Sequence, residues 1–211
     1  MFIQQLINGI TQGSLFALLA ISFGIVYGTL RLLNFATGSM YMIGAYFGWM
    51  FVHHVTPNLF LALLAGASSG FVVGYILERF AFRALRGVAR IASLICTIGF
   101  AMFFNELMSV LFGAERRAMP SFYAETAFVI QGVTVSWLQI ILVLVAAVVL
   151  ILLQLLIYRT KLGLAIRAVS LDFKTASLMG IPTDRVISLT FSLAGAVAGI
   201  AGVLAAAYYN A

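Results

Sequence analysis

The sequence predicts an all-α polytopic membrane protein with about six transmembrane helices. Of its 211 residues, 64% are hydrophobic and only 9% are charged, whereas a soluble domain carries about 25% charged residues. The apolar stretches are about 20 residues long and nearly free of charge, which is the length that a helix needs to cross a hydrocarbon core of roughly 30 Å. These observations exclude a soluble fold and predict a single membrane domain over residues 1–211.

Six apolar segments justify the helix count. They are predicted at residues 5–30, 39–56, 59–77, 91–113, 137–158 and 186–207. A short turn at 31–38 joins the first two segments, and Pro57 closes the hairpin made by the second and third. The N-terminus has neither a basic region nor a small-residue cleavage site, so the first segment is interpreted as a retained span rather than a signal peptide.

Basic residues orient these spans. Nine of the twelve Lys and Arg residues lie in two loops, at about 78–90 and 159–185. Two spans separate the loops, so both loops lie on one side, and the retention of basic loops in the cytoplasm makes that side cytoplasmic. The N-terminus and the loop at about 114–136 are then external, although Arg116 and Arg117 oppose the rule. Topology therefore explains the net charge of +6, and no nucleic-acid partner is predicted.

The sequence carries no recognisable catalytic or cofactor motif. Neither Lys161 nor Lys174 follows a glycine, as the lysine of a phosphate-binding loop does. His53 and His54 are adjacent at an external helix end, without acidic or cysteine residues to complete a metal site. We therefore predict no catalytic residue, no metal site and no cofactor bound by this chain.

Glycines spaced four apart predict close helix packing, because small residues let membrane helices approach one another. Five such sets occur, in four of the six spans. They are Gly9 and Gly13, Gly24 and Gly28, Gly44 and Gly48, Gly66, Gly70 and Gly74, and Gly195 and Gly199.

Polar residues inside spans suggest a second feature, a transport pathway. Asn8, Thr11 and Gln12 share one face near the external end of the first span. They line a substrate entrance or hydrogen-bond to neighbouring helices. Glu106 lies near the outer end of the fourth span, where we expect it to pair with Arg116 or Arg117, or to reach interfacial water, rather than to couple protons.

The polar segment 159–185 interrupts two apolar spans and has the pattern of a docking surface. Gly163 is expected to end an entry turn, and residues 164–179 are compatible with one short amphipathic helix. Gly180 provides a C-terminal cap, Pro182 prevents continuation, and Thr183 or Asp184 can cap the next helix. This helix docks on a partner or lies on the membrane surface. Its apolar stripe consists of Leu164, Leu171 and Leu178.

Three long runs of the sequence resemble a known family. They are QQLINGITQGSLFALLAISFGIVYGTLRLLNFATGSMYMIGAY, ERFAFRALRG and RTKLGLAIRAVSLDFKTASLMGIPTDRVISLTF. In this order they resemble the permeases of branched-chain amino acid ABC transporters, the shorter permease of the pair. The resemblance covers essentially the whole chain and makes the third run the cytoplasmic coupling loop.

This resemblance implies a non-catalytic subunit of an importer in a bacterial or archaeal plasma membrane. Its partners would be a second, homologous permease, two ATP-binding subunits that hold ATP and Mg, and an external solute-binding protein. The coupling loop would sit in a cleft of an ATPase subunit. The loop residues that match the family pattern are Gly163, Arg167, Asp172, Ala176, Gly180 and Asp184.

Two further parts of the sequence acquire a role through the resemblance. The segment NFATG matches the first internal turn of the family, although Thr37 stands where the family usually has histidine, and it makes Asn34 and Gly38 candidates for the pathway. A small external hairpin is predicted at residues 128–135, with Gln131 and Gly132 at its turn. It touches the binding protein or caps the helix ends.

The family continues beyond the position of Ala211, so the resemblance implies a fragment or a chain that has lost helices. The glycine face of the sixth span, formed by Gly195, Gly199 and Gly202, would then lack its partner. Other functions stay open at this point. They are an ABC permease for urea or short amides, a secondary transporter driven by an ion gradient, and a structural membrane subunit.

Overall fold

The computed structural model describes residues 2–83, 85, 90–113, 118–120, 126–130 and 133–210. Five residues named above therefore lie outside the described part of the chain. They are Arg116, Arg117, Gln131, Gly132 and Ala211.

Helices form almost all of the described chain, as predicted. The long helices are α1 (Phe2–Leu30), α2 (Thr37–His54), α3 (Leu59–Leu77), α4 (Arg90–Phe112), α5 (Trp137–Arg159) and α8 (Thr183–Tyr209). A π-helical turn, η1 (Glu78–Phe82), extends α3, and two short helices, α6 (Lys161–Leu171) and α7 (Phe173–Leu178), join α5 to α8. Within the described residues, five helices are long and apolar enough to cross a membrane, namely all the long ones except the shorter α2.

A small hairpin is the remaining element. Strand β1 (Thr126–Ile130) pairs with the antiparallel strand β2 (Val133–Ser136), which confirms the predicted hairpin. The Gln4 side chain on α1 holds β2 by two hydrogen bonds. Its Nε2 donates to the carbonyl of Thr134, and its Oε1 accepts from the Thr134 amide, each at 2.9 Å. The hairpin is thus fixed to the start of α1.

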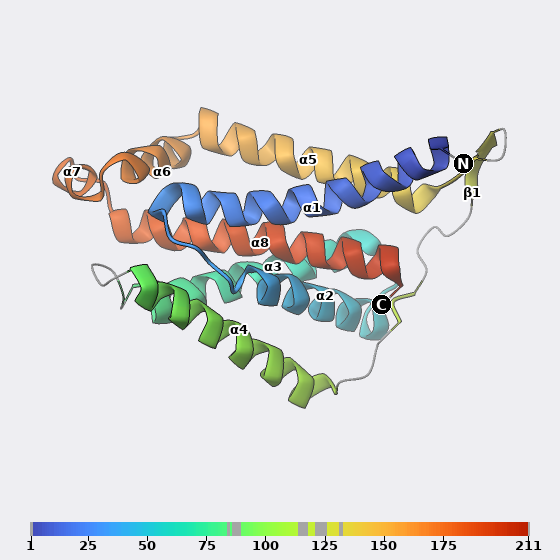
Figure 1. Ribbon diagram of the computed structural model, residues 1–211, viewed down its shortest axis with the longest axis horizontal. Coiled ribbons are helices and arrows are strands. Elements are labelled where there is room, and N and C mark those ends of the chain that lie inside the picture. Colours follow the sequence, from blue (N-terminus) through green and yellow to red (C-terminus); the bar gives the residue numbers. More distant parts are fainter. Residues whose placement is uncertain are drawn as a thin grey trace.

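Helix α8 forms the centre of the bundle, where it lies between α1 and the pair α2 and α3 (Figure 1). In its apolar window 78% of the residues are buried, against 11% for α5. Close backbone approach explains this burial. A Cβ atom on Gly70 would overlap the carbonyl oxygen of Gly195, and a Cβ on Gly199 would overlap that of Gly66. Helices α3 and α8 therefore pack backbone against backbone.

The prediction that glycines spaced four apart mediate close helix packing is correct for α2, α3 and α8 and wrong for α1. A Cβ on Gly44 would collide with Gly199, and one on Gly202 would collide with the carbonyl of Tyr41, so α2 also packs on α8 through glycine. The glycine face of α8 is therefore covered by α2 and α3, contrary to the expectation that it would lack a partner. The α1 glycines point into open space, with no described atom within 4 Å of an added Cβ. They are Gly9, Gly13, Gly24 and Gly28.

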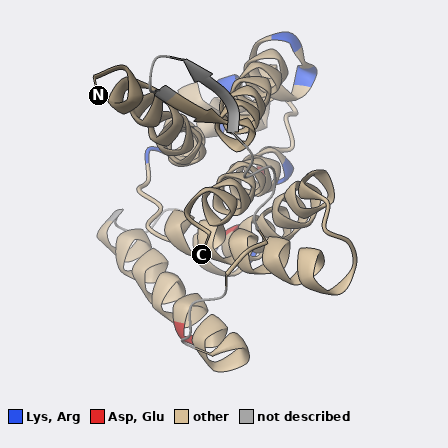
Figure 2. Ribbon diagram, turned by 90° about the vertical axis from the view of Figure 1, so that its right-hand side faces the viewer, with Lys and Arg blue, Asp and Glu red and all other residues tan. Residues whose placement is uncertain are grey.

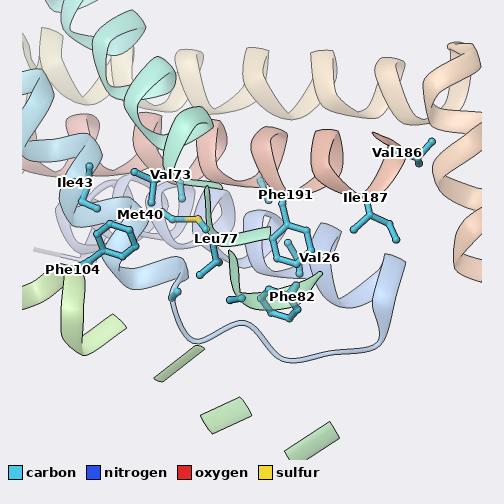
Figure 3. Close-up of a cluster of buried hydrophobic side chains, with 14 of the residues drawn as sticks. Val26, Met40, Ile43, Val73, Leu77, Phe82, Phe104, Val186, Ile187 and Phe191 are labelled. Atoms are coloured by element: carbon cyan, nitrogen blue, oxygen red, sulfur yellow. The ribbon is translucent and has the colours of Figure 1, made fainter. Parts of the chain in front are cut away.

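A buried aromatic contact fixes the η1 end of this core. The rings of Phe82 on η1 and Phe191 on α8 lie 4.5 Å apart, centroid to centroid, and both side chains are buried. Figure 3 shows these rings together with Val26 and Leu77, inside the larger of two hydrophobic clusters. This packing joins α1, α3 and α8 just before the chain leaves the bundle.

Charge separates the two ends of the molecule. All nine described Lys and Arg residues lie at the end that carries η1, α6 and α7, here called the basic end. The N-terminus, the hairpin and the C-terminus lie at the opposite end (Figure 1, Figure 2). The two basic loops thus share one end, as predicted, while the assignment of that end to the cytoplasm stays a prediction.

Candidate functional site

The loop between α5 and α8 begins with a capped helix. The Thr160 hydroxyl accepts a hydrogen bond from the Gly163 amide at 3.1 Å and caps α6. Gly163 therefore lies in the first turn of α6 and does not end an entry turn, contrary to prediction. A Cβ here would overlap the carbonyl oxygen of Ile157, so glycine is required for α6 to fold back against the end of α5.

The prediction of a single amphipathic helix over residues 164–179 is wrong, because Asp172 divides this segment into α6 and α7. Asp172 is extended, with φ −152° and ψ 113°. Its carboxylate accepts from the Lys174 amide at 2.9 Å, the Thr175 amide at 3.3 Å and the Thr175 hydroxyl at 2.6 Å. Aspartate favours such capping over a helix interior. The hydrogen bonds from Thr175, followed by the one from Lys174, lower the pKa of Asp172.

The exit of α7 is a Schellman turn, as the glycine predicted. Gly180 has φ +81°, a conformation that glycine adopts without strain. The Ile181 amide donates to the Ala176 carbonyl at 3.1 Å, and the Gly180 amide donates to Ser177 at 3.0 Å. Helix α8 follows after Pro182. The N-cap residue of α8 is Pro182, and not Thr183 or Asp184 as predicted.

Asp184 instead connects the loop to η1. Its Oδ2 accepts a hydrogen bond from Arg83 Nη2 at 2.7 Å, and the two side chains form an ion pair. One turn further along α8, Ser188 donates to the carboxylate of Glu78, which is fully buried. Sequence reasoning placed Glu78 in a polar loop and missed this contact. The available signal was an acidic residue directly after an apolar span, because a carboxylate in that position needs a protein partner.

The six residues that match the family pattern determine the turns and the packing of this loop. Gly163, Asp172 and Gly180 set its turns, and Asp184 ties it to η1. Ala176 is buried against the core, and Arg167 lies over the Tyr158 ring, 5.4 Å from guanidinium carbon to centroid. The structure therefore assigns them architectural positions in one continuous segment.

Apolar side chains of the same loop point outward. In the segment 171–180, which is described throughout, only Ala176 is buried. The exposed fractions are 84% for Leu171, 87% for Leu178 and 79% for Met179. These three residues are called the outer apolar surface. The predicted stripe contained two of them, and Met179 was missed because it was interpreted as the last residue of the helix.

The pathway candidates of α1 lie at the end opposite the loop. Asn8 accepts a hydrogen bond from Gln139 Nε2 at 3.1 Å, which joins α1 to α5. Thr11 is buried and donates to the carbonyl of Ile7 in its own helix, while Gln12 is exposed. For Asn8, the structure shows a hydrogen bond to a neighbouring helix, which was one of the two predicted alternatives.

Asn34 and Gly38 lie at the connection between α1 and α2. Asn34 is 1% exposed, and its Oδ1 accepts from the Ala36 amide at 3.1 Å. Within the described chain its Nδ2 has no hydrogen-bond partner. Gly38 lies in the first turn of α2 and has no described atom within 4 Å of an added Cβ. The structure does not bring this pair together with Asn8, Thr11 and Gln12, and the pathway role of all five stays a prediction.

Comparison with known proteins identifies the family. The family described as "Branched-chain amino acid transport system / permease component" matches residues 5–211. The permease protein BraD of the high-affinity branched-chain amino acid transport system of Pseudomonas aeruginosa is 35% identical over 223 residues, which cover 99% of this chain and 72% of the relative. The high-affinity branched-chain amino acid transport system permease protein LivH of Escherichia coli K12 is also 35% identical, over 221 residues that cover 99% of this chain and 72% of the relative.

A more distant relative comes from an archaeon. The probable branched-chain amino acid transport permease protein LivH of Methanocaldococcus jannaschii is 28% identical over 215 residues, which cover 93% of this chain and 64% of the relative. No solved structure matches significantly. The extent of the family match and the 35% identity of the bacterial relatives indicate the same family. The apolar helix bundle is consistent with a membrane permease. This chain therefore belongs to the family of branched-chain amino acid transport system permease components.

Proposed function

We propose that this chain is the membrane-spanning subunit of an ATP-driven importer for branched-chain amino acids, and that the loop between α5 and α8 couples it to an ATPase. The names of its relatives support the substrate class. The five long apolar helices support a location in the plasma membrane. The chain itself contributes no catalytic residue, and ATP and Mg bind to partner subunits.

The outer apolar surface is the observation that carries this proposal. Leu171, Leu178 and Met179 are each at least 79% exposed, at the tip of the molecule where α7 extends beyond the end of α5 (Figure 1). Three strongly exposed apolar residues within nine positions of one loop support an interaction site there. The neighbouring Lys174 adds a positive charge that suits an acidic cleft. An ATPase subunit seated here would cover the three side chains at the basic end, which we place in the cytoplasm.

The contacts behind this surface give the loop a route to the membrane helices. The Schellman turn fixes α7 to α8, and the Arg83–Asp184 ion pair fixes the start of α8 to η1. The Ser188–Glu78 hydrogen bond continues this connection one turn deeper. A movement of α7 driven by nucleotide binding on the partner would therefore reach α3 and α8 together.

The proposed assembly contains two ATP-binding subunits, a second homologous permease and an external solute-binding protein. With the basic end in the cytoplasm, the N-terminus and the hairpin face outward, where the binding protein docks. Substrate selection rests mainly with that protein, so a permease of the same architecture for urea or short amides is the second candidate.

Uptake measurements test the substrate half of the proposal. Deletion of the gene is expected to abolish high-affinity uptake of labelled leucine and to leave urea uptake unchanged. Leucine uptake that survives deletion while urea uptake is lost would overturn the branched-chain assignment. An ion-gradient transporter is tested by Glu106→Gln, because Glu106 is an exposed carboxylate on α4. We expect this variant to transport normally.

A further inference from the structure

An open groove lies on the outside of the bundle between α1, α5 and α6. It has a volume of about 400 Å³ and is separate from the outer apolar surface. Leu153 and Ile157 of α5 form one wall, and Gly24 and Gly28 of α1 lie in the other. Arg167 of α6 lines the groove where it reaches the basic end.

The two glycines create the space. No described atom lies within 4 Å of a Cβ placed on Gly24 or Gly28, whereas the glycines of α3 and α8 meet backbone atoms at that distance. Gly24 and Gly28 are one turn apart, about 6 Å along the axis at 1.5 Å per residue. Because α1 ends at Leu30 and its lining residues begin at Ala20, the groove occupies about the last three turns before the chain leaves the apolar layer.

The charge at the groove is positive. Arg167 lies over the exposed Tyr158 ring, with its charged group at the level where α5 ends. Arg159 and Lys161 are exposed at the neighbouring junction of α5 and α6. No acidic side chain lines the groove in the described part of the chain. An apolar slot with a cationic end matches a molecule that has an apolar tail and an anionic head.

We propose that this groove binds an anionic glycerophospholipid of the leaflet at the basic end. One acyl chain lies along Gly24 and Gly28 against Ile157, and the headgroup phosphate pairs with Arg167. Basic pockets between membrane helices bind anionic headgroups in this way, and arginine reaches the interface along its apolar stem. Arg167 is thereby assigned to lipid, whereas the outer apolar surface contacts the ATPase.

This inference does not depend on the proposed function, because it concerns lipid and a different face of the loop. Loss of lipid binding without loss of ATPase association would separate the two. A membrane helix of a second permease could also use the open glycines, and its presence in the groove is an outcome of the test.

Native mass spectrometry of the full chain tests the proposal. The protein is equilibrated in nanodiscs of phosphatidylcholine that contain phosphatidylglycerol, released in mild detergent, and the retained lipids are counted. We expect one phosphatidylglycerol molecule to be retained in preference to phosphatidylcholine. Arg167→Gln removes the cation and is expected to lower that preference about fivefold. Gly28→Leu fills the groove and is expected to abolish retention of either lipid at this site.

Gly13→Leu is the matched control, because Gly13 is also open, lies on α1 and is outside the groove. This variant is expected to retain lipid like the parent chain, which would show that added bulk on α1 is not itself the cause. Equal retention of the two lipids by the parent chain would overturn the anionic assignment. Unchanged retention in Gly28→Leu, or a copurified permease that excludes lipid from the groove, would overturn the site.

Discussion

Arg83 and Asp184 form an ion pair at 2.7 Å although 101 residues separate them in the sequence. The pair joins the residue that follows η1 to the first turn of α8. Its side chains are 40% and 48% exposed, so water screens the interaction. Its value to stability is therefore small, about 1 kcal/mol or less. Its position at the end of the loop between α5 and α8 gives it a different use, the alignment of α8 with α3.

Asp184→Asn is therefore expected to reduce transport more than stability. The melting temperature in detergent should change little, while leucine uptake falls because α8 loses its attachment to η1. The charge-swapped pair Arg83→Asp with Asp184→Arg restores the attraction and should recover part of the uptake. A swapped variant that is no better than the sum of its two single substitutions would show that the pair carries no coupling.

The glycine contacts of the core predict strong sensitivity to one methyl group. Gly70→Ala would place a Cβ on the carbonyl oxygen of Gly195, and backbone atoms cannot yield without separating α3 from α8. We expect a loss of about 1–3 kcal/mol or more in the free energy of unfolding. Thermal unfolding in mild detergent measures it.

Gly9→Ala is the matched opposite case. Its added methyl group meets no described atom, and alanine is a better helix former than glycine by roughly 0.5–1 kcal/mol. A gain or no change in melting temperature is expected. Equal destabilisation by Gly70→Ala and Gly9→Ala would contradict the backbone-to-backbone packing of α3 on α8.

These glycines also show which features of the fold the sequence alone could predict. Apolar length located the spans to within a few residues, because the bilayer fixes how long a spanning helix must be. Spacing alone cannot tell which glycines meet another helix. Gly24 and Gly28 have the same spacing as Gly66 and Gly70, yet only the second pair is covered. Helix orientation about its own axis decides this, and it depends on all neighbours at once.

The loop between α5 and α8 shows the same limit at the level of single residues. Gly180 was predicted as a cap because glycine tolerates a positive φ. Asp172 was interpreted as part of a helix, although aspartate is also a preferred N-cap residue. In the structure its carboxylate accepts from the amides of Lys174 and Thr175. The burial of Glu78 depends on Ser188, which is 110 residues away, and no local pattern contains that contact.

The Asp172 cap predicts a specific pH dependence. Hydrogen bonds to the carboxylate lower its folded pKa below the ordinary value of 3.8. A lowered folded pKa stabilises the capped state above the ordinary pKa, and this contribution is lost as the pH falls through the folded value. Helix α7 should therefore be equally protected at pH 7 and pH 5, and should fray below 3.8. Amide hydrogen exchange at Lys174 and Thr175 measures this.

Asp172→Asn supplies the control for that experiment, because asparagine also caps helices but does not titrate. The variant should show no loss of protection of α7 over the same pH range, once global unfolding is accounted for. Fraying of both proteins at the same pH would mean that another group controls α7.

Glu78 is expected to contribute to the stability of the fold through its hydrogen bond with Ser188. Glu78→Gln keeps an acceptor for Ser188, whereas Glu78→Ala removes the hydrogen bond of the half-buried Ser188 hydroxyl, which costs about 0.5–1.5 kcal/mol. The alanine variant should therefore melt at a lower temperature than the glutamine variant. Equal melting temperatures would show that the contact with Ser188 adds nothing to stability.

Copurification with candidate ATPase subunits tests the central claim most directly. The chain is expressed with those subunits, extracted in mild detergent, and the ATPase retained per permease is quantified. Leu178→Ser with Met179→Ser should lose the ATPase, because burial of the outer apolar surface drives association. Ser177→Ala changes the same exposed helix without removing an apolar side chain or adding a charge, and it should retain the ATPase. Undiminished retention by the Leu178 and Met179 double variant would contradict the assignment of the coupling surface to this loop.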